Sequence, residues 1–277
     1  MTLQIKREPG RITFLRTEDG SVLLVQNALP DTRPFLHPIA TPDGAGILTE
    51  DSPPHHPWQH GLYVGMNAVN GVGFWTERER DGTFHPAPLT DPVAEGSQAE
   101  WKVTASWRDP SGDPVLTETQ EWKLADQGSR LELGLRWTLA AEVPSVSFGR
   151  YDYGGLFLRM PYRSDADSPS LLTSEGATRP GEAEGKRARW VALAMTVGGK
   201  AKSAGIAILD HPGNPEHPTP WRVDEQYGIG PSRCISGAWQ LEQGKPATAR
   251  YRIVVFTGEP DAGLLNSRWQ DFCEEQS

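Results

Sequence analysis

Leu131-Glu-Leu-Gly-Leu-Arg-Trp-Thr-Leu139 is the stretch that indicates the fold most directly. Apolar side chains occupy every second position across it, so that one face carries Leu131, Leu133, Leu135, Trp137 and Leu139. Alternation with a period of two is typical of a β-strand that buries one face. We therefore predict a strand here, with its apolar face turned toward a core.

Similar patterns occur on both sides of this stretch. The Asp-Gly pair in residues 17–20 lies between the apolar runs 12–15 and 22–25, which is typical of a β-hairpin. Further strands are predicted at residues 101–107, 117–124, 155–160, 190–196, 205–209 and 249–256. Only residues 261–275 show helical spacing, and Asp261 could cap the start of that helix.

These elements predict an all-β protein, a large antiparallel β-sandwich with a short C-terminal helix. The 277 residues suffice for one large domain, and we expect a single domain over residues 1–277. The strands before Leu139 should form the first sheet, and the second half should complete the sandwich. We expect the helix on the outside or at one edge, and residues 164–189 as a long loop or insertion.

Composition and charge narrow the choice of partners. The net charge is -9 without a basic patch, which argues against nucleic acid. No apolar run approaches the roughly 20 residues that span a bilayer, and residues 1–10 contain no apolar signal segment. Cys234 and Cys273 show no metal-type spacing. We expect a cytoplasmic protein without a membrane or nucleic-acid partner, for which homo-oligomerisation stays open.

Two proline-rich loops concentrate the histidines. The first is Ser52-Pro-Pro-His-His-Pro-Trp-Gln-His-Gly-Leu-Tyr63, and the second is Asp210-His-Pro-Gly-Asn-Pro-Glu-His-Pro-Thr-Pro-Trp-Arg222. Proline fixes φ and removes a backbone donor, so both stretches should be stiff and non-helical. We expect the two loops to converge on one pocket.

Several chemistries fit such a pocket. His56, His60 and His211 are the candidate acid and base groups, and Arg159 is a candidate for binding a hydroxyl or enolate oxygen. Two or three imidazoles with a carboxylate could instead bind a divalent metal, although we expect no cofactor. In a third interpretation, the histidines only structure exposed loops. No nucleotide-binding glycine loop is present.

Aromatic and polar residues near these loops are candidate ligand contacts. Tryptophan can stack on the apolar face of a sugar ring, while neighbouring polar groups bind its hydroxyls. An arginine on an apolar strand needs a carboxylate partner or a ligand, and Asp152 or Glu77 could pair with Arg159. The predicted substrate-binding residues are His55, Trp58, Trp75, Asn67, Arg150, Asp152, Tyr153, Asp210, His217 and Trp221.

Five motifs occur in a fixed order along the chain. They are the first histidine loop, Val69-Asn-Gly-Val-Gly-Phe-Trp75, Tyr153-Gly-Gly-Leu-Phe-Leu-Arg159, the second loop and Gly244-Lys-Pro-Ala-Thr-Ala-Arg-Tyr-Arg252. Together they resemble the bacterial family labelled methane oxygenase PmoA-like, a group of uncharacterised domains. The resemblance implies carbohydrate metabolism and a supersandwich of the galactose-mutarotase type. We therefore expect an enzyme that acts on a sugar, keto-sugar or glycoside by proton transfer, as an epimerase, mutarotase, lyase or hydrolase. A carbohydrate-binding domain, or a subunit of a sugar-modifying complex, is the alternative.

Overall fold

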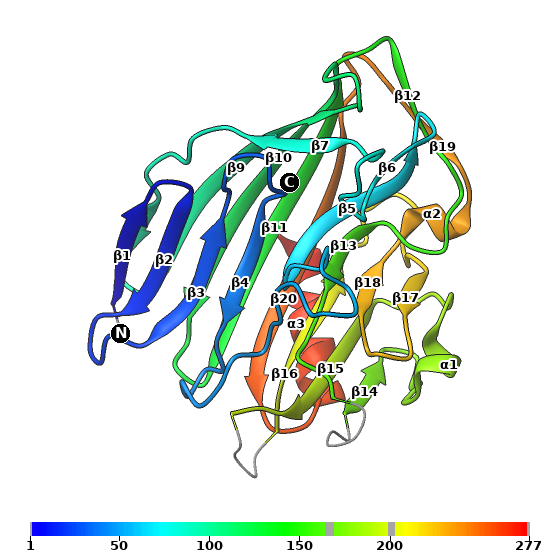
Figure 1. Cartoon of the computed structure of the whole chain (residues 1–277). Coiled ribbons are helices and arrows are strands. Elements are labelled where there is room, and N and C mark those ends of the chain that lie inside the picture. Colours follow the sequence, from blue (N-terminus) through cyan, green and yellow to red (C-terminus); the bar gives the residue numbers. More distant parts are fainter. Residues whose placement is uncertain (1, 164–168, 199–202, 276–277) are drawn as a thin grey trace.

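The computed structural model describes residues 2–163, 169–198 and 203–275, and it shows two antiparallel sheets that pack face to face (Figure 1). The first sheet follows the order β1–β2–β3–β4–β5–β13–β18–β17, with β6 and β12 beside β5 and with β19 beside β12. The second follows β14–β15–β16–β20–β11–β10–β9–β7, with β8 beside β9. The predicted antiparallel sandwich is therefore confirmed.

The strands of the first sheet are β1 (Leu3–Glu8), β2 (Arg11–Arg16), β3 (Val22–Asn27), β4 (Phe35–Ile39), β5 (Leu62–Val69), β6 (Val72–Phe74), β12 (Ser145–Phe148), β13 (Gly155–Leu158), β17 (Trp221–Val223), β18 (Ile229–Pro231) and β19 (Trp239–Glu242). Those of the second are β7 (Thr83–Pro86), β8 (Val93–Glu95), β9 (Gln98–Arg108), β10 (Pro114–Asp126), β11 (Arg130–Ala141), β14 (Ser170–Thr173), β15 (Trp190–Thr196), β16 (Ser203–Asp210) and β20 (Ala247–Thr257). The helices are α1 (Pro180–Ala183), α2 (Arg233–Ser236) and α3 (Ala262–Glu274).

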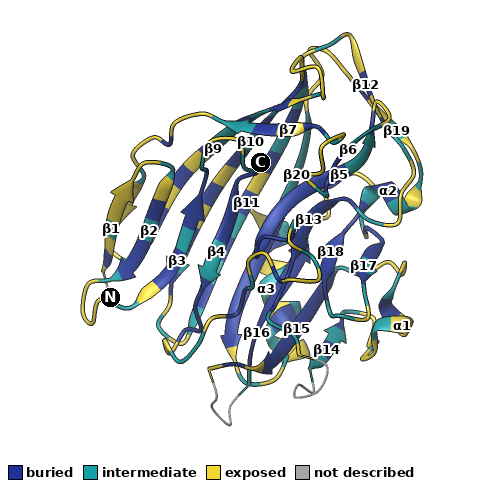
Figure 2. Cartoon of the chain, viewed as in Figure 1, coloured by how far each residue is buried: buried dark blue, intermediate teal, exposed yellow. Residues whose placement is uncertain are grey.

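The apolar face of β11 lies in the core between the sheets, as its alternation predicts. Its five inward side chains are each at most 6% exposed. The long meander β9–β10–β11 supplies much of the second sheet, and the strands of the first sheet supply the opposite wall of the same apolar cluster. Figure 2 shows that the central strands are buried along most of their length, whereas β1 at the edge is largely exposed.

The division of strands between the sheets differs from the prediction. The chain leaves the first sheet after β6 and builds β7 to β11 in the second sheet, before it returns at β12 and β13. The prediction that all strands before Leu139 form one sheet was wrong, because alternation shows that a strand has a buried face but not which sheet it joins. Part of the predicted loop at residues 164–189 forms β14 and α1, while residues 164–168 lie outside the described ranges.

The outer faces of the two sheets carry different features. Helix α3 begins at Asp261, whose side chain accepts a hydrogen bond from the Leu264 amide at 3.0 Å, as expected for an N-cap. The helix packs through Leu265 and Phe272 against the outer face of β15, β16 and β20. None of the helices in the described ranges is long and apolar enough to cross a membrane.

Candidate functional site

An aromatic cluster covers the outer face of the first sheet. It consists of Phe35 on β4, Tyr63 on β5, Phe157 on β13 and Trp75 after β6, with Trp58 and Tyr153 packed against it. Side chains of a strand alternate between its two faces, so the neighbours of these aromatic residues in sequence point into the core. The four rings on or next to the strands are each at most 6% exposed, so they form a buried apolar floor on the outer side of the sheet, and Trp58 and Tyr153 are its half-buried members.

The first histidine loop lies over this floor. The Asp51–His60 bridge and the bond from the Ser52 amide to the Gln59 carbonyl, 2.8 Å, close the loop. At its base, the Arg159 amide donates to the Gly61 carbonyl at 2.7 Å, and its carbonyl accepts from the Glu50 amide at 3.0 Å. Gly61 has a φ of 65°, and a Cβ there would lie 2.5 Å from the Leu36 carbonyl oxygen, so only glycine fits the turn into β5.

His60 is fixed between two carboxylates. Its Nδ1 lies 2.6 Å from an Asp51 oxygen, and its Nε2 lies 3.3 Å from an oxygen of Glu77. The other Glu77 oxygen lies 2.6 Å from Nε of Arg33, whose side chain is fully buried. Ionised carboxylates only accept hydrogen bonds, so both nitrogens of His60 must donate and the ring is the imidazolium ion. We call Asp51, His60, Glu77 and Arg33 the charge network.

The pKa directions agree with this assignment. Burial alone would lower the pKa of His60, but the hydrogen bonds to Asp51 and Glu77 outweigh it and raise the pKa. Burial alone would raise the pKa of Glu77, yet His60 and Arg33 lower it to about 2. His60 was predicted as a candidate acid or base, and the structure argues against the base role, because a 7% exposed imidazolium with both nitrogens engaged cannot accept a proton.

Stability should therefore depend on the protonation of His60. A raised pKa in the folded state stabilises the fold fully below the unfolded value, about 6.5, and this contribution is lost as pH rises through the folded value. We expect His60→Gln to lower the free energy of unfolding by about 1–3 kcal/mol at pH 6, and by less at pH 9. Urea unfolding at both pH values measures this, with His85→Gln as the control, because the half-buried His85 on β7 pairs with an exposed carboxylate, Asp31, outside the charge network. A deficit that grows with pH would contradict the charged pair.

Arg159 directly follows β13, and its positive charge is buried without a carboxylate at hydrogen-bond distance. It is fully buried, yet its nearest carboxylate oxygen, on Glu50, lies 3.8 Å from Nε. Nη2 donates to Nε2 of His55 at 2.7 Å, and Nη1 has only contacts of 3.4 Å to Gln226. Asp152 and Glu77, the predicted partners, do not pair with it among the described contacts. A buried cation in this state is costly unless a ligand completes it.

Further polar atoms at this point have hydrogen-bonding capacity to spare. Within the described ranges, Tyr63 Oη, Arg159 Nε and His56 Nδ1 are buried without a hydrogen-bond partner. Burial raises the pKa of Tyr63 well above its usual value, so its hydroxyl stays a donor. The carboxylate of Asp224 acts electrostatically on Tyr63, Arg159, His55 and His56, which places it beside the same group. Buried polar groups are normally satisfied, so these atoms point to a polar ligand.

The two remaining histidines of the loop are neutral. Burial, followed by the charge of Arg159, lowers the pKa of His55, and burial with His55 and Arg159 lowers the pKa of His56. Nε2 of His55 accepts from Arg159, because a guanidinium can only donate. His56 stacks edge-on against His55 and Trp58, with ring centroids 5.0 and 5.4 Å apart. His56 is therefore the neutral imidazole with the most freedom to accept a proton.

The other predicted ligand contacts fall into two groups. Trp58, Trp75 and Tyr153 belong to the aromatic cluster, and Asn67 hydrogen-bonds Tyr153. Arg150 and Asp152 are exposed and make no hydrogen bond or ion pair among the described residues, so the structure does not bring them into the site. Sequence reasoning missed Tyr63, Asp224 and Asp51, whose roles depend on neighbours far away in the chain. A turn motif, Asp224-x-Gln-x-Gly228, was the available signal for Asp224.

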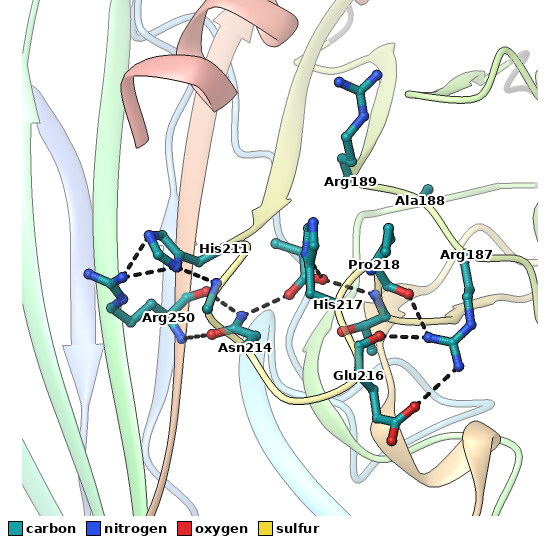
Figure 3. Close-up of polar contacts among 12 residues, drawn as sticks. Arg187, Ala188, Arg189, His211, Asn214, Glu216, His217, Pro218 and Arg250 are labelled. Atoms are coloured by element: carbon teal, nitrogen blue, oxygen red, sulfur yellow. Dashed lines mark hydrogen bonds and ion pairs between the residues drawn. The ribbon is translucent and has the colours of Figure 1, made fainter. Parts of the chain in front are cut away.

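The second loop forms a scaffold of its own (Figure 3). The fully buried Asp210 accepts from Nδ1 of His217 at 2.8 Å and from Nδ2 of Asn214 at 2.7 Å. Arg250 on β20 lies against His211, 2.7 Å from Nε2, and burial followed by this cation lowers the pKa of His211 to about 4. These contacts fasten the loop to β20, and Figure 3 shows the side chains directed toward one another.

The structure thereby corrects the expectation of one site built from both loops. His217 stacks on Trp269 of α3, so this loop belongs to the outer side of the second sheet, whereas the first histidine loop covers the outer side of the first. No hydrogen bond, ion pair or ring contact between described residues joins the loops. Trp221 is fully buried in the core and donates to the Ala188 carbonyl, so it cannot stack on a ligand. His211, His217 and Asp210 hold the fold together.

A metal centre finds no support in the described part of the chain. No group of three or more His, Cys, Asp or Glu side chains is arranged there to hold an ion. Cys234 and Cys273 are free thiols. The expectation that no cofactor is needed stays a prediction.

Comparison with known families adds one assignment. The model of a family of unknown function, DUF6807, matches residues 23–270. The chain belongs to this family. The resemblance of this DUF6807 protein to the PmoA-like family stays a prediction, and no curated protein matches the sequence.

The solved structures that match the DUF6807 chain share little sequence with it. A galactose mutarotase related enzyme from Lactobacillus acidophilus has 7% identity and a TM-score of 0.38, over 94% of this chain and 99% of that one. A candidate aldose 1-epimerase from Klebsiella pneumoniae has 9% identity and a TM-score of 0.37, over 98% and 90%. A GH36 alpha-galactosidase from Geobacillus stearothermophilus has 12% identity and a TM-score of 0.38, over 94% of this chain but 41% of that one. The chain thus spans about two fifths of that galactosidase.

Proposed function

We propose that the DUF6807 chain is a carbohydrate-active enzyme that binds a sugar or keto-sugar over the aromatic cluster and moves a proton with His56. The observation that carries this is the buried, incompletely compensated Arg159 beside the unpartnered hydroxyl of Tyr63. These two donors interact electrostatically with each other, and a pair of neighbouring donors suits a carbonyl or enolate oxygen. Trp58 and Tyr153, the half-buried members of the aromatic cluster, suit the apolar face of a pyranose ring.

The proposed step uses each group in the protonation state that the structure favours. Neutral His56 takes a proton from the carbon next to the carbonyl, and the C–H electron pair becomes a carbon–carbon double bond. The carbonyl oxygen gains the negative charge, which Arg159 and the hydroxyl of Tyr63 stabilise. Protonated His56 then returns a proton, exchanged with solvent, to the same face of the carbon, or a substituent on the next carbon leaves with its bonding electron pair and takes that proton. Asp224 offsets the charge of Arg159 between turnovers.

Deuterium exchange tests this proposal directly. In D2O, a panel of aldoses and 3-keto-glycosides incubated with the wild-type protein should show incorporation next to the carbonyl by NMR. We expect His56→Gln to slow the exchange by about 10²–10⁴-fold, the usual contribution of a positioned base. His85→Gln, on β7 of the second sheet, should keep the wild-type rate.

Two outcomes would contradict the proposal. If His56→Gln exchanges as fast as wild type on a substrate that turns over, His56 is not the base. If sugars bind but none of the panel exchanges or reacts, the domain is a carbohydrate-binding module. The salt-bridged His60, which cannot act as a base, is compatible with that outcome.

A further inference from the structure

A groove of about 400 Å³ lies beside the candidate site on the same face of the first sheet. Its walls come from β1 to β4 and from the base of the first histidine loop, where Phe35, Asp51 and His60 line it. Phe35 also belongs to the aromatic cluster, and His60 stacks on it with ring centroids 4.9 Å apart. The groove therefore begins where the aromatic floor ends.

Strand register places the groove and the aromatic cluster in one cross-strand row of the first sheet. Arg11 pairs with Asn27, Asn27 with Phe35, Phe35 with Tyr63, and Tyr63 with Phe157. This single row crosses five neighbouring strands, from β2 in the groove to β13, the strand that Arg159 follows. At about 4.8 Å between strands, the four steps cover roughly 19 Å. A pyranose ring placed against the half-buried Trp58 and Tyr153, which pack on the Tyr63 and Phe157 end of the row, would leave the Arg11 end uncovered.

The groove offers polar groups and apolar surface together. Arg11 uses Nε to bond Asn27 at 3.1 Å, and its terminal nitrogens have no partner among the described residues. Thr13 on β2 and Glu8 on β1 also present oxygens without a hydrogen bond in the described contacts. Val25, beside Thr13 in the next strand, adds apolar surface. Pockets of this size, mainly apolar with a few polar groups that fix orientation, are typical of small-ligand sites.

We infer that this groove is a second subsite, and that the ligand is a glycoside with a second sugar unit, which the groove binds, rather than a free monosaccharide. The inference rests on the proposed function, because the reacting ring lies over the aromatic cluster. Arg11 binds hydroxyls of the second unit through its free terminal nitrogens, and Thr13 and Val25 contact its faces. The groove thus determines specificity for substrate length without touching the reacting atoms.

A larger side chain that fills the groove tests this inference. Thr13 is half-buried on the groove floor, away from Arg159 and His56. We expect wild type to bind disaccharides such as cellobiose, trehalose or lactose about tenfold or more tightly than glucose or galactose by calorimetry. Thr13→Trp should remove that advantage and leave monosaccharide affinity unchanged. Thr13→Ser should behave as wild type, as should Thr119→Trp, which adds the same bulk to the second sheet.

The outcomes separate this inference from the proposed function. Equal affinity of wild type for both ligand lengths overturns the subsite alone, provided that monosaccharides still bind or exchange. An equal loss of both affinities in Thr13→Trp overturns it as well. If none of these sugars binds wild type, both proposals fail. Saturation-transfer NMR with a disaccharide should show contact to both rings in wild type and to one ring in Thr13→Trp.

Discussion

Arg159→Met is expected to lower turnover by about 10²–10³-fold, the usual cost of losing one donor to a developing oxyanion, while the fold stays as stable as wild type or becomes more stable. The two effects have one cause. Arg159 is fully buried without a close carboxylate, so the folded protein bears the cost of its desolvation. Methionine has a similar length and carries no charge. The substrate oxygen, by contrast, loses its main cationic partner.

The partners of Arg159 should tolerate this change. Glu50 retains its ion pair with Arg163, and the exposed His55 can turn to solvent. Turnover on the substrate found by deuterium exchange, together with the midpoint of urea unfolding, gives both results. Arg163→Met is the control for the loss of a nearby exposed cation, and it should reduce turnover far less. Loss of several kcal/mol of stability in Arg159→Met would show that the residue is structural and would remove the basis for a ligand there.

The opposite behaviour is expected of Glu77→Leu, which should lower the free energy of unfolding by about 3–5 kcal/mol. Glu77 is the only carboxylate within ion-pair distance of Arg33 among the described residues, and it also binds His60. Without it, the hydrogen-bond acceptors left to Arg33 among the described residues are the carbonyls of Trp75 and Val64, at 2.6 and 3.4 Å, and the rings of Tyr63 and Phe84 supply no anionic charge. Two buried cations would then lie close together without their shared counter-ion.

Matched variants make this result specific. Glu79→Leu removes an exposed carboxylate two residues away and should change stability by less than about 0.5 kcal/mol. Arg33→Met combined with Glu77→Leu should be more stable than Glu77→Leu alone, because it removes a charge that has lost its partner. Denaturant unfolding of wild type, Arg33→Met, Glu77→Leu and the double variant yields the coupling energy. A coupling energy near zero would mean that the charge network contributes nothing through Glu77.

Much of the secondary structure could be predicted from local pattern. The alternation of residues 131–139, the Asp-Gly hairpin and the Asp261 cap all correspond to elements of the structure, and 190–196 matches β15 residue for residue. The assignment of strands to sheets failed, because it depends on which distant strands pair. The polar strand at 117–124 illustrates the limit: Glu118 faces the core, where the indole nitrogens of Trp107 and Trp137 donate to it.

The candidate site could be predicted only in part. The first histidine loop, Arg159 and the nearby aromatic residues lie together as the motifs suggested, whereas the second loop holds α3 and β20 to each other. The two loops look alike in sequence, because both contain prolines that stiffen the backbone and histidines that can titrate. The sequence does not show which side chains surround those histidines in the fold. Burial and charge partners decide whether a histidine is free, as with His56, or salt-bridged, as with His60.

By itself, the sequence determined the class of fold and the stiff loop that carries the histidines, since side-chain periodicity and proline act through the local backbone. Only the tertiary structure decided which groups meet. The cross-strand row from Arg11 to Phe157 exists because five strands pair in one register. Likewise, Glu77 becomes the counter-ion of Arg33, 44 residues away, and Arg159 is left without a close one. Proton affinity and ligand binding follow from such neighbours, which the packing of the sheets brings together.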